Sequence, residues 1–217
     1  PGDPELPASL EVGLPVPDPS GLPEPAPPPD PADVAAFSAA RTSVLRSIAD
    51  ACARAARDPG AVTLVAVGKT VEPSRLRAAV AAGLTTLGEN RVHEAQEKVP
   101  LVPGACWHLV GPLQANKARR AVAIFDVIES VDSLALAVRL DRLCGELRPG
   151  RPLPVLLQVN VDADPAKAGF TPGELTDALP VLARLANLEL GGLMTVGRVV
   201  ATAEEARATF RALRILS

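Results

Sequence analysis

The sequence has 217 residues and a formal net charge of −3, and hydrophobic residues make up 47% of it. This length gives one domain with a sizeable core and barely suffices for two. Every long apolar stretch is broken by a charged residue, Gly or Pro, so we expect no membrane-spanning helix. The small negative charge gives no electrostatic case for a nucleic acid partner.

The three cysteines, Cys52, Cys106 and Cys144, lie far apart, and none belongs to a C-x-x-C pair. Such spacing is not that of a disulfide scaffold or a thiolate zinc site. The amino end also lacks the basic and apolar regions of a secretory signal. We therefore expect a cytoplasmic protein without a metal site.

Composition divides the chain near residue 33. Residues 1–33 contain twelve of the 23 prolines and seven acidic side chains but no Lys or Arg. Proline removes backbone donors and the acids repel one another, so we expect a disordered, partly polyproline-II tail. The tail is either a linker or a partner-binding segment. Removing its seven acids from the net charge of −3 leaves +4 for residues 34–217, which suits a small anionic ligand.

Regular elements begin after the tail. Asp33 can cap a first helix with an apolar face at three- and four-residue spacing. Six β-branched apolar runs follow, at residues 63–67, 85–87, 107–110, 127–131, 155–161 and 188–194. Helix-like stretches lie between them, with start signals at Pro73, Ser133 and Thr171.

Strands that alternate with helices at this rhythm indicate parallel βαβ units. The rhythm alone leaves open whether the sheet is doubly wound or a closed barrel. A complete (β/α)₈ barrel usually takes about 250 residues, whereas residues 34–217 supply six predicted strands. A barrel built from this segment is therefore incomplete, with about six of eight units.

Lys69 directly follows the first predicted strand, at the carboxyl end where α/β proteins build their sites. Partial desolvation there would lower the pKa of its amine, which could then form a Schiff base with an aldehyde. The alternative is a solvated lysine that opens a loop. Gly68-Lys69-Thr70 is not a phosphate-binding P-loop, because that motif needs a Gly where this chain has Thr63.

Three other residues follow or end predicted strands. Asn90, in Gly-Glu-Asn, can cap the helix predicted over 91–98 or aim its amide at a ligand. His108 alternates with Trp107 and Leu109, and we interpret it as a structural, hydrogen-bonded histidine. Met194 ends the sixth strand and is either core or pocket wall.

Four motifs together carry a family resemblance. They are Val-Gly-Lys-Thr, Gly-Glu-Asn, Trp-His-Leu-Val-Gly-Pro-Leu-Gln-Ala-Asn-Lys and Gly-Leu-Met-Thr-Val-Gly. In this order they resemble the pyridoxal 5′-phosphate homeostasis protein family, whose fold is like the barrel domain of alanine racemase. The resemblance implies that Lys69 forms the Schiff base with pyridoxal phosphate and that Asn90 lies in the pocket. We take Met194 as a third candidate contact.

Members of that family are not known as enzymes, so the resemblance implies a non-catalytic protein of vitamin B6 balance. The family continues with a seventh and an eighth strand that hold the cofactor phosphate, so we expect a chain truncated at its carboxyl end, and a monomer. Two alternatives stay open. One is a degenerate fragment with impaired binding, and the other is a pyridoxal phosphate-dependent racemase or decarboxylase. The racemase would need a tyrosine, and the sequence has none.

Overall fold

Six parallel strands form a single sheet in which each strand pairs with its neighbours in the chain, in the order β1-β2-β3-β4-β5-β6. The structure is a computed structural model and describes residues 27–217. The strands are β1 (Ala66–Val67), β2 (Thr86–Glu89), β3 (Cys106–Leu109), β4 (Val127–Val131), β5 (Leu153–Gln158) and β6 (Leu188–Met194). A doubly wound sheet reverses its strand order at a switch point. This sheet has no such reversal, so its strand order is that of a barrel.

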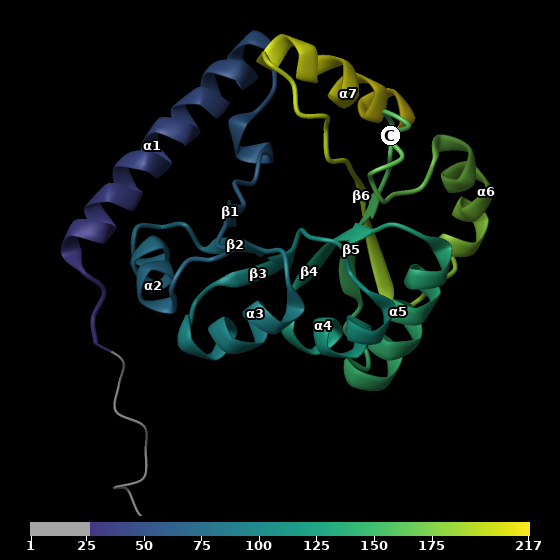
Figure 1. Ribbon diagram of the computed structural model, residues 1–217, viewed down its shortest axis with the longest axis horizontal. Helices are drawn as coiled ribbons and strands as arrows, with labels where there is room; N and C mark the ends of the chain where they lie inside the picture. The colour runs from purple at the N-terminus through teal and green to yellow at the C-terminus, as the bar shows by residue number, and fades with distance from the viewer. Residues whose placement is uncertain (1–26) are drawn as a thin grey trace, which may run out of the picture.

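Helices connect the strands and flank the sheet. They are α1 (Pro31–Arg54), α2 (Pro73–Ala81), α3 (Val92–Lys98), α4 (Ala118–Ile124), α5 (Leu134–Leu147), α6 (Pro172–Leu182) and α7 (Ala203–Leu216). Short 3₁₀ turns lie at Pro59–Ala61, Val99–Leu101 and Ala115–Lys117. Figure 1 shows the sheet curving as part of a ring with α2 to α6 around its outside.

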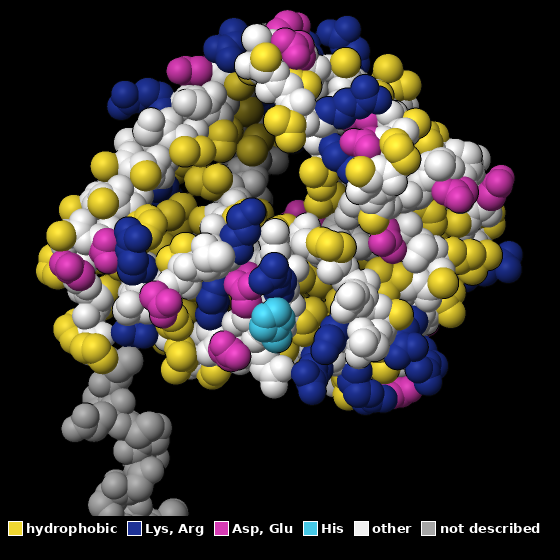
Figure 2. All heavy atoms as spheres, viewed as in Figure 1, with side chains coloured by type: hydrophobic (Ala, Val, Ile, Leu, Met, Phe, Trp, Pro, Cys, Tyr) yellow, Lys and Arg dark blue, Asp and Glu magenta, His cyan; other side chains and the backbone are white. Residues whose placement is uncertain are grey.

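The ring is open within residues 27–217, because β1 pairs only with β2 and β6 only with β5. In Figure 1, α1 and α7 lie on this open side. Figure 2 shows a hollow there, bordered by hydrophobic side chains. The predicted incomplete barrel of six strands is therefore confirmed for the described part of the chain.

The core lies between the sheet and the outer helices. Trp107 and Leu109 of β3 are buried there, and so are Phe125, after α4, and Leu140 of α5. The opposite face of the sheet looks into the ring, and Val67 on it is half exposed. One face of the sheet thus carries the core, and the other faces the inside of the ring (Figure 1).

The first helix begins earlier than the sequence predicts. Asp30, not Asp33, is the N-cap, and its carboxylate accepts a hydrogen bond of 2.8 Å from the Ala32 amide. Pro31 occupies the first turn, where its fixed φ favours helix and no amide donor is lost. Asp33 instead forms an ion pair of 3.3 Å with Arg75 of α2. Residues 1–26, which hold most of the predicted tail, lie outside the described residues, so the prediction of disorder stays a prediction.

Two of the predicted helix starts have side-chain caps. The Ser133 side chain accepts a hydrogen bond from the Leu136 amide at the start of α5, and Thr171 forms a capping box with Glu174 at the start of α6. The first strand is shorter than predicted, with two residues instead of five. Because β1 is an edge strand, only one side of it carries ladder hydrogen bonds.

Candidate functional site

Lys69 stands directly beyond β1, at the carboxyl edge of the sheet. The preceding residue, Gly68, is buried, and its amide donates a hydrogen bond of 2.8 Å to the Gly88 carbonyl of β2. The Lys69 side chain is exposed, so the predicted partial desolvation does not occur here. The reason is the position of β1 at the open edge of the ring. Within the described residues the Lys69 ammonium forms no ion pair.

Parallel pairing brings the carboxyl ends of β1 and β2 to the same edge of the sheet. Val67 pairs with Gly88, and a Cβ on Gly88 would meet Val67 at 3.3 Å. Lys69 follows Val67 by two residues and Asn90 follows Gly88 by two residues, so both candidate residues stand just beyond this edge.

Asn90 is not a helix cap. The N-cap of α3 is Arg91, and no side-chain hydrogen bond caps this helix. This overturns the interpretation of Asn90 as the cap of α3. Asn90 also borders a cleft of about 500 Å³ whose lining includes His93, Gln114 and Lys117. Lys69 is not part of that lining.

A buried ion pair lies beneath the predicted ligand residues. Glu89, at the end of β2, is fully buried, and its Oε1 lies 2.5 Å from Nζ of Lys98, the last residue of α3. The sequence analysis did not single out either residue. Glu89 belongs to the Gly-Glu-Asn motif, but alternation alone would not reveal a lysine on the following helix as its partner.

Glu94, one turn before Lys98, joins this cluster. Its Oε2 lies 3.6 Å from the Lys98 Nζ and accepts a hydrogen bond of 3.5 Å from the Thr70 amide. Burial by itself raises the pKa of Glu94, but the Thr70 hydrogen bond and the charges of Lys98 and Arg91 outweigh it and hold the pKa below its ordinary value of 4.5. Glu94 therefore stays ionised at neutral pH.

The His108 side chain has a hydrogen-bond partner, as predicted, and its structural role stays a prediction. Its Nδ1 lies 2.6 Å from Oε1 of Glu129 on the neighbouring strand β4. Trp107 and Leu109 are buried on the other face of β3, which confirms the predicted alternation. The pair spans two strands on the inner face of the ring.

Met194 ends β6 and is half-buried. Its carbonyl accepts a hydrogen bond of 2.8 Å from the Val159 amide after β5. Because β6 is the last strand in the sheet order, Met194 and Lys69 belong to opposite edges of the open ring. Strand pairing does not bring them together.

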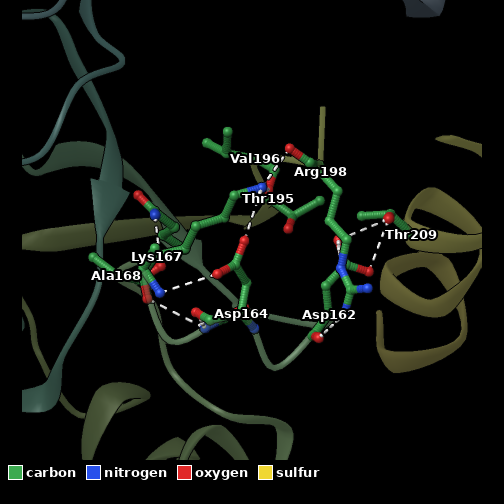
Figure 3. A network of polar contacts seen from close by, with 12 residues as sticks. Asp162, Asp164, Lys167, Ala168, Thr195, Val196, Arg198 and Thr209 are labelled. Atoms are coloured by element: carbon green, nitrogen blue, oxygen red, sulfur yellow. Dashed lines mark hydrogen bonds and ion pairs between the residues drawn. The ribbon is translucent and has the colours of Figure 1, made fainter. Parts of the chain in front are cut away.

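A polar network fastens the loops after β5 and β6 (Figure 3). Lys167 Nζ donates hydrogen bonds to the carbonyls of Val196 at 2.9 Å and Gly197 at 2.5 Å. It also lies 4.0 Å from the Asp164 carboxylate. Nearby, the Thr209 hydroxyl of α7 donates to the Asp162 carboxylate at 2.8 Å. The sequence analysis did not consider Lys167. Its ammonium thus connects the loop after β5 to the loop after β6.

In residues 27–217, no group of three or more His, Cys, Asp or Glu side chains has the arrangement of a metal site. None of the helices in that part is both long and apolar enough to cross a bilayer. The three cysteines are free, with Cys52 and Cys144 buried and Cys106 exposed.

Most of the chain matches a known protein family. The profile described as "Alanine racemase, N-terminal domain" matches residues 45–216, from within α1 to the end of α7. The chain belongs to this family. Within it, the chain falls among the pyridoxal phosphate homeostasis proteins, as the following relatives show.

Curated relatives carry the name "Pyridoxal phosphate homeostasis protein". The protein from Pseudomonas aeruginosa is 39% identical over 178 residues, which cover 80% of this chain and 75% of that protein. The protein from Synechocystis sp. is 40% identical over 163 residues, 73% of each chain. The predicted family membership is therefore confirmed.

Several solved structures are similar to this chain as well. PipY of Synechococcus elongatus, solved with pyridoxal phosphate bound, is 42% identical, covers 82% of this chain and 79% of its own, and superimposes with a TM-score of 0.69. A protein from Bifidobacterium adolescentis has 32% identity and a TM-score of 0.75, with 86% of this chain and 79% of that chain covered. Alanine racemase from Clostridium difficile, at 15% identity and a TM-score of 0.59 over 70% of this chain and 43% of that chain, shares the fold alone.

Proposed function

We propose that this member of the family binds pyridoxal 5′-phosphate through a Schiff base on Lys69 and holds it without catalysing a reaction. Relatives at 39% and 40% identity are named as pyridoxal phosphate homeostasis proteins, and PipY has been solved with this molecule bound. The observation that carries the proposal is the state of Lys69, an exposed amine just beyond β1, at the carboxyl edge of the sheet where Asn90 follows β2.

Lys69 stands out when it is compared with other lysines near this edge. Lys98 is 8% exposed and is paired with Glu89. Lys167 donates to two carbonyls. A lysine must release its proton and approach a carbonyl carbon to act as a nucleophile, and an amine that is already tied to acceptors does so poorly. Lys69 carries no such tie among the described residues.

The residues present fit the aldehyde portion of the ligand. Pyridoxal phosphate supplies an aldehyde that condenses with a primary amine to give an imine and one molecule of water. The Lys69 amine is the nucleophile in this assignment, and the Asn90 amide, free of a capping role, offers both a donor and an acceptor. The net charge of +4 over residues 34–217 favours an anionic ligand.

Holding rather than turnover agrees with the composition of the chain. An alanine racemase requires a tyrosine as its second acid–base group, and this sequence contains none. Incubation of the loaded protein with L-alanine is therefore expected to give no D-alanine, and steady formation of D-alanine would contradict the non-catalytic assignment.

The experiment is a visible absorbance titration with pyridoxal phosphate, followed by borohydride reduction and peptide mapping. One equivalent is expected to be trapped at Lys69. The Lys69→Ala variant loses the absorbance band and the label while its thermal unfolding stays close to that of the wild type, because the side chain is exposed. Lys117→Ala is the matched control, since Lys117 lies beside the cleft that Asn90 borders, and it is expected to bind normally.

A second candidate is a chain that folds but does not retain the ligand. It is favoured by one observation, that within residues 27–217 β1 and β6 each pair on one side only and leave Lys69 and Met194 on opposite sides of the opening. Weak labelling spread over several lysines would support this candidate and contradict the first.

The three free cysteines agree with a reducing compartment, and we place the protein in the cytoplasm. We expect a monomer. Fractionation of the producing cell and sedimentation of the purified chain test these two assignments separately.

A further inference from the structure

The Glu89–Lys98 pair connects the two strand ends that carry Lys69 and Asn90. Lys98 Nζ donates a hydrogen bond of 2.9 Å to the carbonyl of Gly68, the residue just before Lys69. Glu89 Oε2 accepts a hydrogen bond of 3.0 Å from the backbone amide of Asn90. One ion pair therefore fixes the backbone at both predicted ligand residues.

Every polar atom of the pair has a defined partner. Lys98 directs its ammonium at Gly68 O, Glu89 Oε1 and Glu94 Oε2, at 2.9, 2.5 and 3.6 Å. Glu89 uses Oε1 for Lys98 and Oε2 for the Asn90 amide. Complete pairing of this kind offsets part of the cost of removing a carboxylate and an ammonium from water.

The backbone that the pair holds has an unusual conformation. Thr70, directly after Lys69, has a φ of +62°, which is rare for a β-branched residue. Glu94 accepts a hydrogen bond from the Thr70 amide at 3.5 Å. Conformations of this kind persist only when surrounding contacts impose them, and here the contacts on both sides of Lys69 come from α3.

Stability alone does not account for the pair. A buried ion pair generally contributes little net stability compared with apolar residues of similar volume, because both charges lose their hydration. A direct link from each charge to the backbone of a ligand residue gives it a different role, namely to set where two side chains lie.

We propose that Glu89 and Lys98 are positioning residues. They hold the backbone at Gly68 and Asn90 so that the Lys69 amine and the side-chain amide of Asn90 face one ligand. The identity of the ligand in this inference rests on the proposed function, whereas the contacts made by Glu89 and Lys98 do not. In this inference, α3 aligns the end of β1 with the end of β2 at the carboxyl edge. Neither residue touches the ligand in this assignment.

The test uses the double variant Glu89→Gln/Lys98→Met, which removes both charges together and leaves no unpaired buried ion. The matched control is Arg119→Met/Glu146→Gln, which removes an ion pair between exposed side chains of α4 and α5. Circular dichroism and thermal unfolding establish that each variant folds. If the double variant fails to fold, Lys98→Arg replaces it in the test. This variant keeps the positive charge, but its guanidinium cannot place a single ammonium among three acceptors.

Two readouts are measured on each protein. The first, in the absence of ligand, is hydrogen exchange of the Asn90 amide and of the peptide around Lys69. We expect exchange at both places to be faster by about tenfold or more in the double variant and unchanged in the control. The second is the rate of borohydride-trapped pyridoxal phosphate at Lys69, expected to fall by about 10- to 100-fold, the effect of misplacing a reacting group by roughly 1 Å.

The outcomes separate this inference from the proposed function. If the folded double variant, or Lys98→Arg in its place, exchanges and reacts as the wild type does, the positioning role is overturned. Faster exchange with an unchanged trapping rate would mark the pair as purely structural and would also overturn it. If the wild type itself is not labelled at Lys69, the proposed function fails. In that case the inference can still be overturned, namely if the Asn90 backbone amide of the double variant exchanges at the same rate as in the wild type.

Discussion

Gly111 presses directly on the backbone of Asn90. A Cβ on Gly111 would stand 2.3 Å from the Asn90 carbonyl oxygen and 2.7 Å from its Cα, distances that no real side chain tolerates. The Gly111 carbonyl in turn accepts a hydrogen bond of 2.6 Å from the Ser130 hydroxyl of β4. The strand ends of β2, β3 and β4 are thus stacked at the site, and the glycine of the Val-Gly-Pro segment is required for that contact.

We predict that Gly111→Ala displaces Asn90 and destabilises the fold. The added methyl group meets backbone rather than a flexible side chain, so the strand ends must separate, at a cost of about 1–3 kcal/mol or more. Denaturant unfolding measures the loss. Gly173→Ala is the control, because a Cβ on Gly173 has no atom within 4 Å, and it is expected to be neutral or slightly stabilising. Equal stability of the two variants would contradict the close approach.

The capping box of α6 gives a prediction on pH. The Thr171 backbone and side-chain hydrogen bonds to the Glu174 carboxylate lower its pKa from 4.5, against a smaller opposing effect of burial. A lowered carboxyl pKa stabilises the fold above the ordinary value, and this stabilisation disappears as the pH falls through the lowered pKa. Thr171→Ala should lower the free energy of unfolding at pH 7 and lower it by less at pH 3. A loss that is the same at both pH values would argue against the reciprocal cap.

The cysteines differ in accessibility and in acidity. Burial raises the pKa of the Cys144 thiol to about 11, with Arg148 opposing and Asp141 adding to the effect. Burial and the nearby Asp126 also raise the pKa of Cys106, although its side chain is exposed. We predict that iodoacetamide at pH 8 modifies Cys106 alone, more slowly than a cysteine in a short peptide, because only the thiolate reacts.

Raising the pH should accelerate the labelling of Cys106, and guanidinium should expose Cys52 and Cys144. Mass spectrometry of the labelled protein distinguishes the three sites. Rapid labelling of Cys144 in the folded protein would show that α5 does not pack as the structure has it.

The attachment of α7 can be tested at Thr209. Its hydroxyl donates to both carboxylate oxygens of Asp162, at 2.8 and 2.9 Å, and the residue is buried. Thr209→Val keeps the shape but removes the donor, which costs about 1.5–3 kcal/mol for a hydrogen bond to a charged group. Hydrogen exchange should increase across α7 more than in β3 or β4. Thr176→Val is the control, since its exposed hydroxyl bonds only the carbonyl of Pro172 within its own helix.

The sequence by itself determined the elements and their alternation. Short apolar runs between helix-like stretches predicted β4 at 127–131 and β6 at 188–194 as they occur, because a short apolar run bounded by turn signals is typical of a strand in a parallel sheet. Ser133 and Thr171 marked helix starts because their hydroxyls satisfy the first free amides, a purely local effect. Local order also placed Lys69 and Asn90 directly after strands, which is all that was needed to make them candidates.

Tertiary structure decided what lies next to what. Whether the sheet is doubly wound or barrel-like depends on strand order, and no local signal specifies that order. The helix-capping interpretation of Asn90 failed because α3 begins after Arg91, and the exposure of Lys69 follows from the edge position of β1. The Glu89–Lys98 pair joins residues nine apart on a strand and a helix. Spacing along the chain could not predict it, because its energy depends on burial, and burial exists only once the helix lies against the sheet.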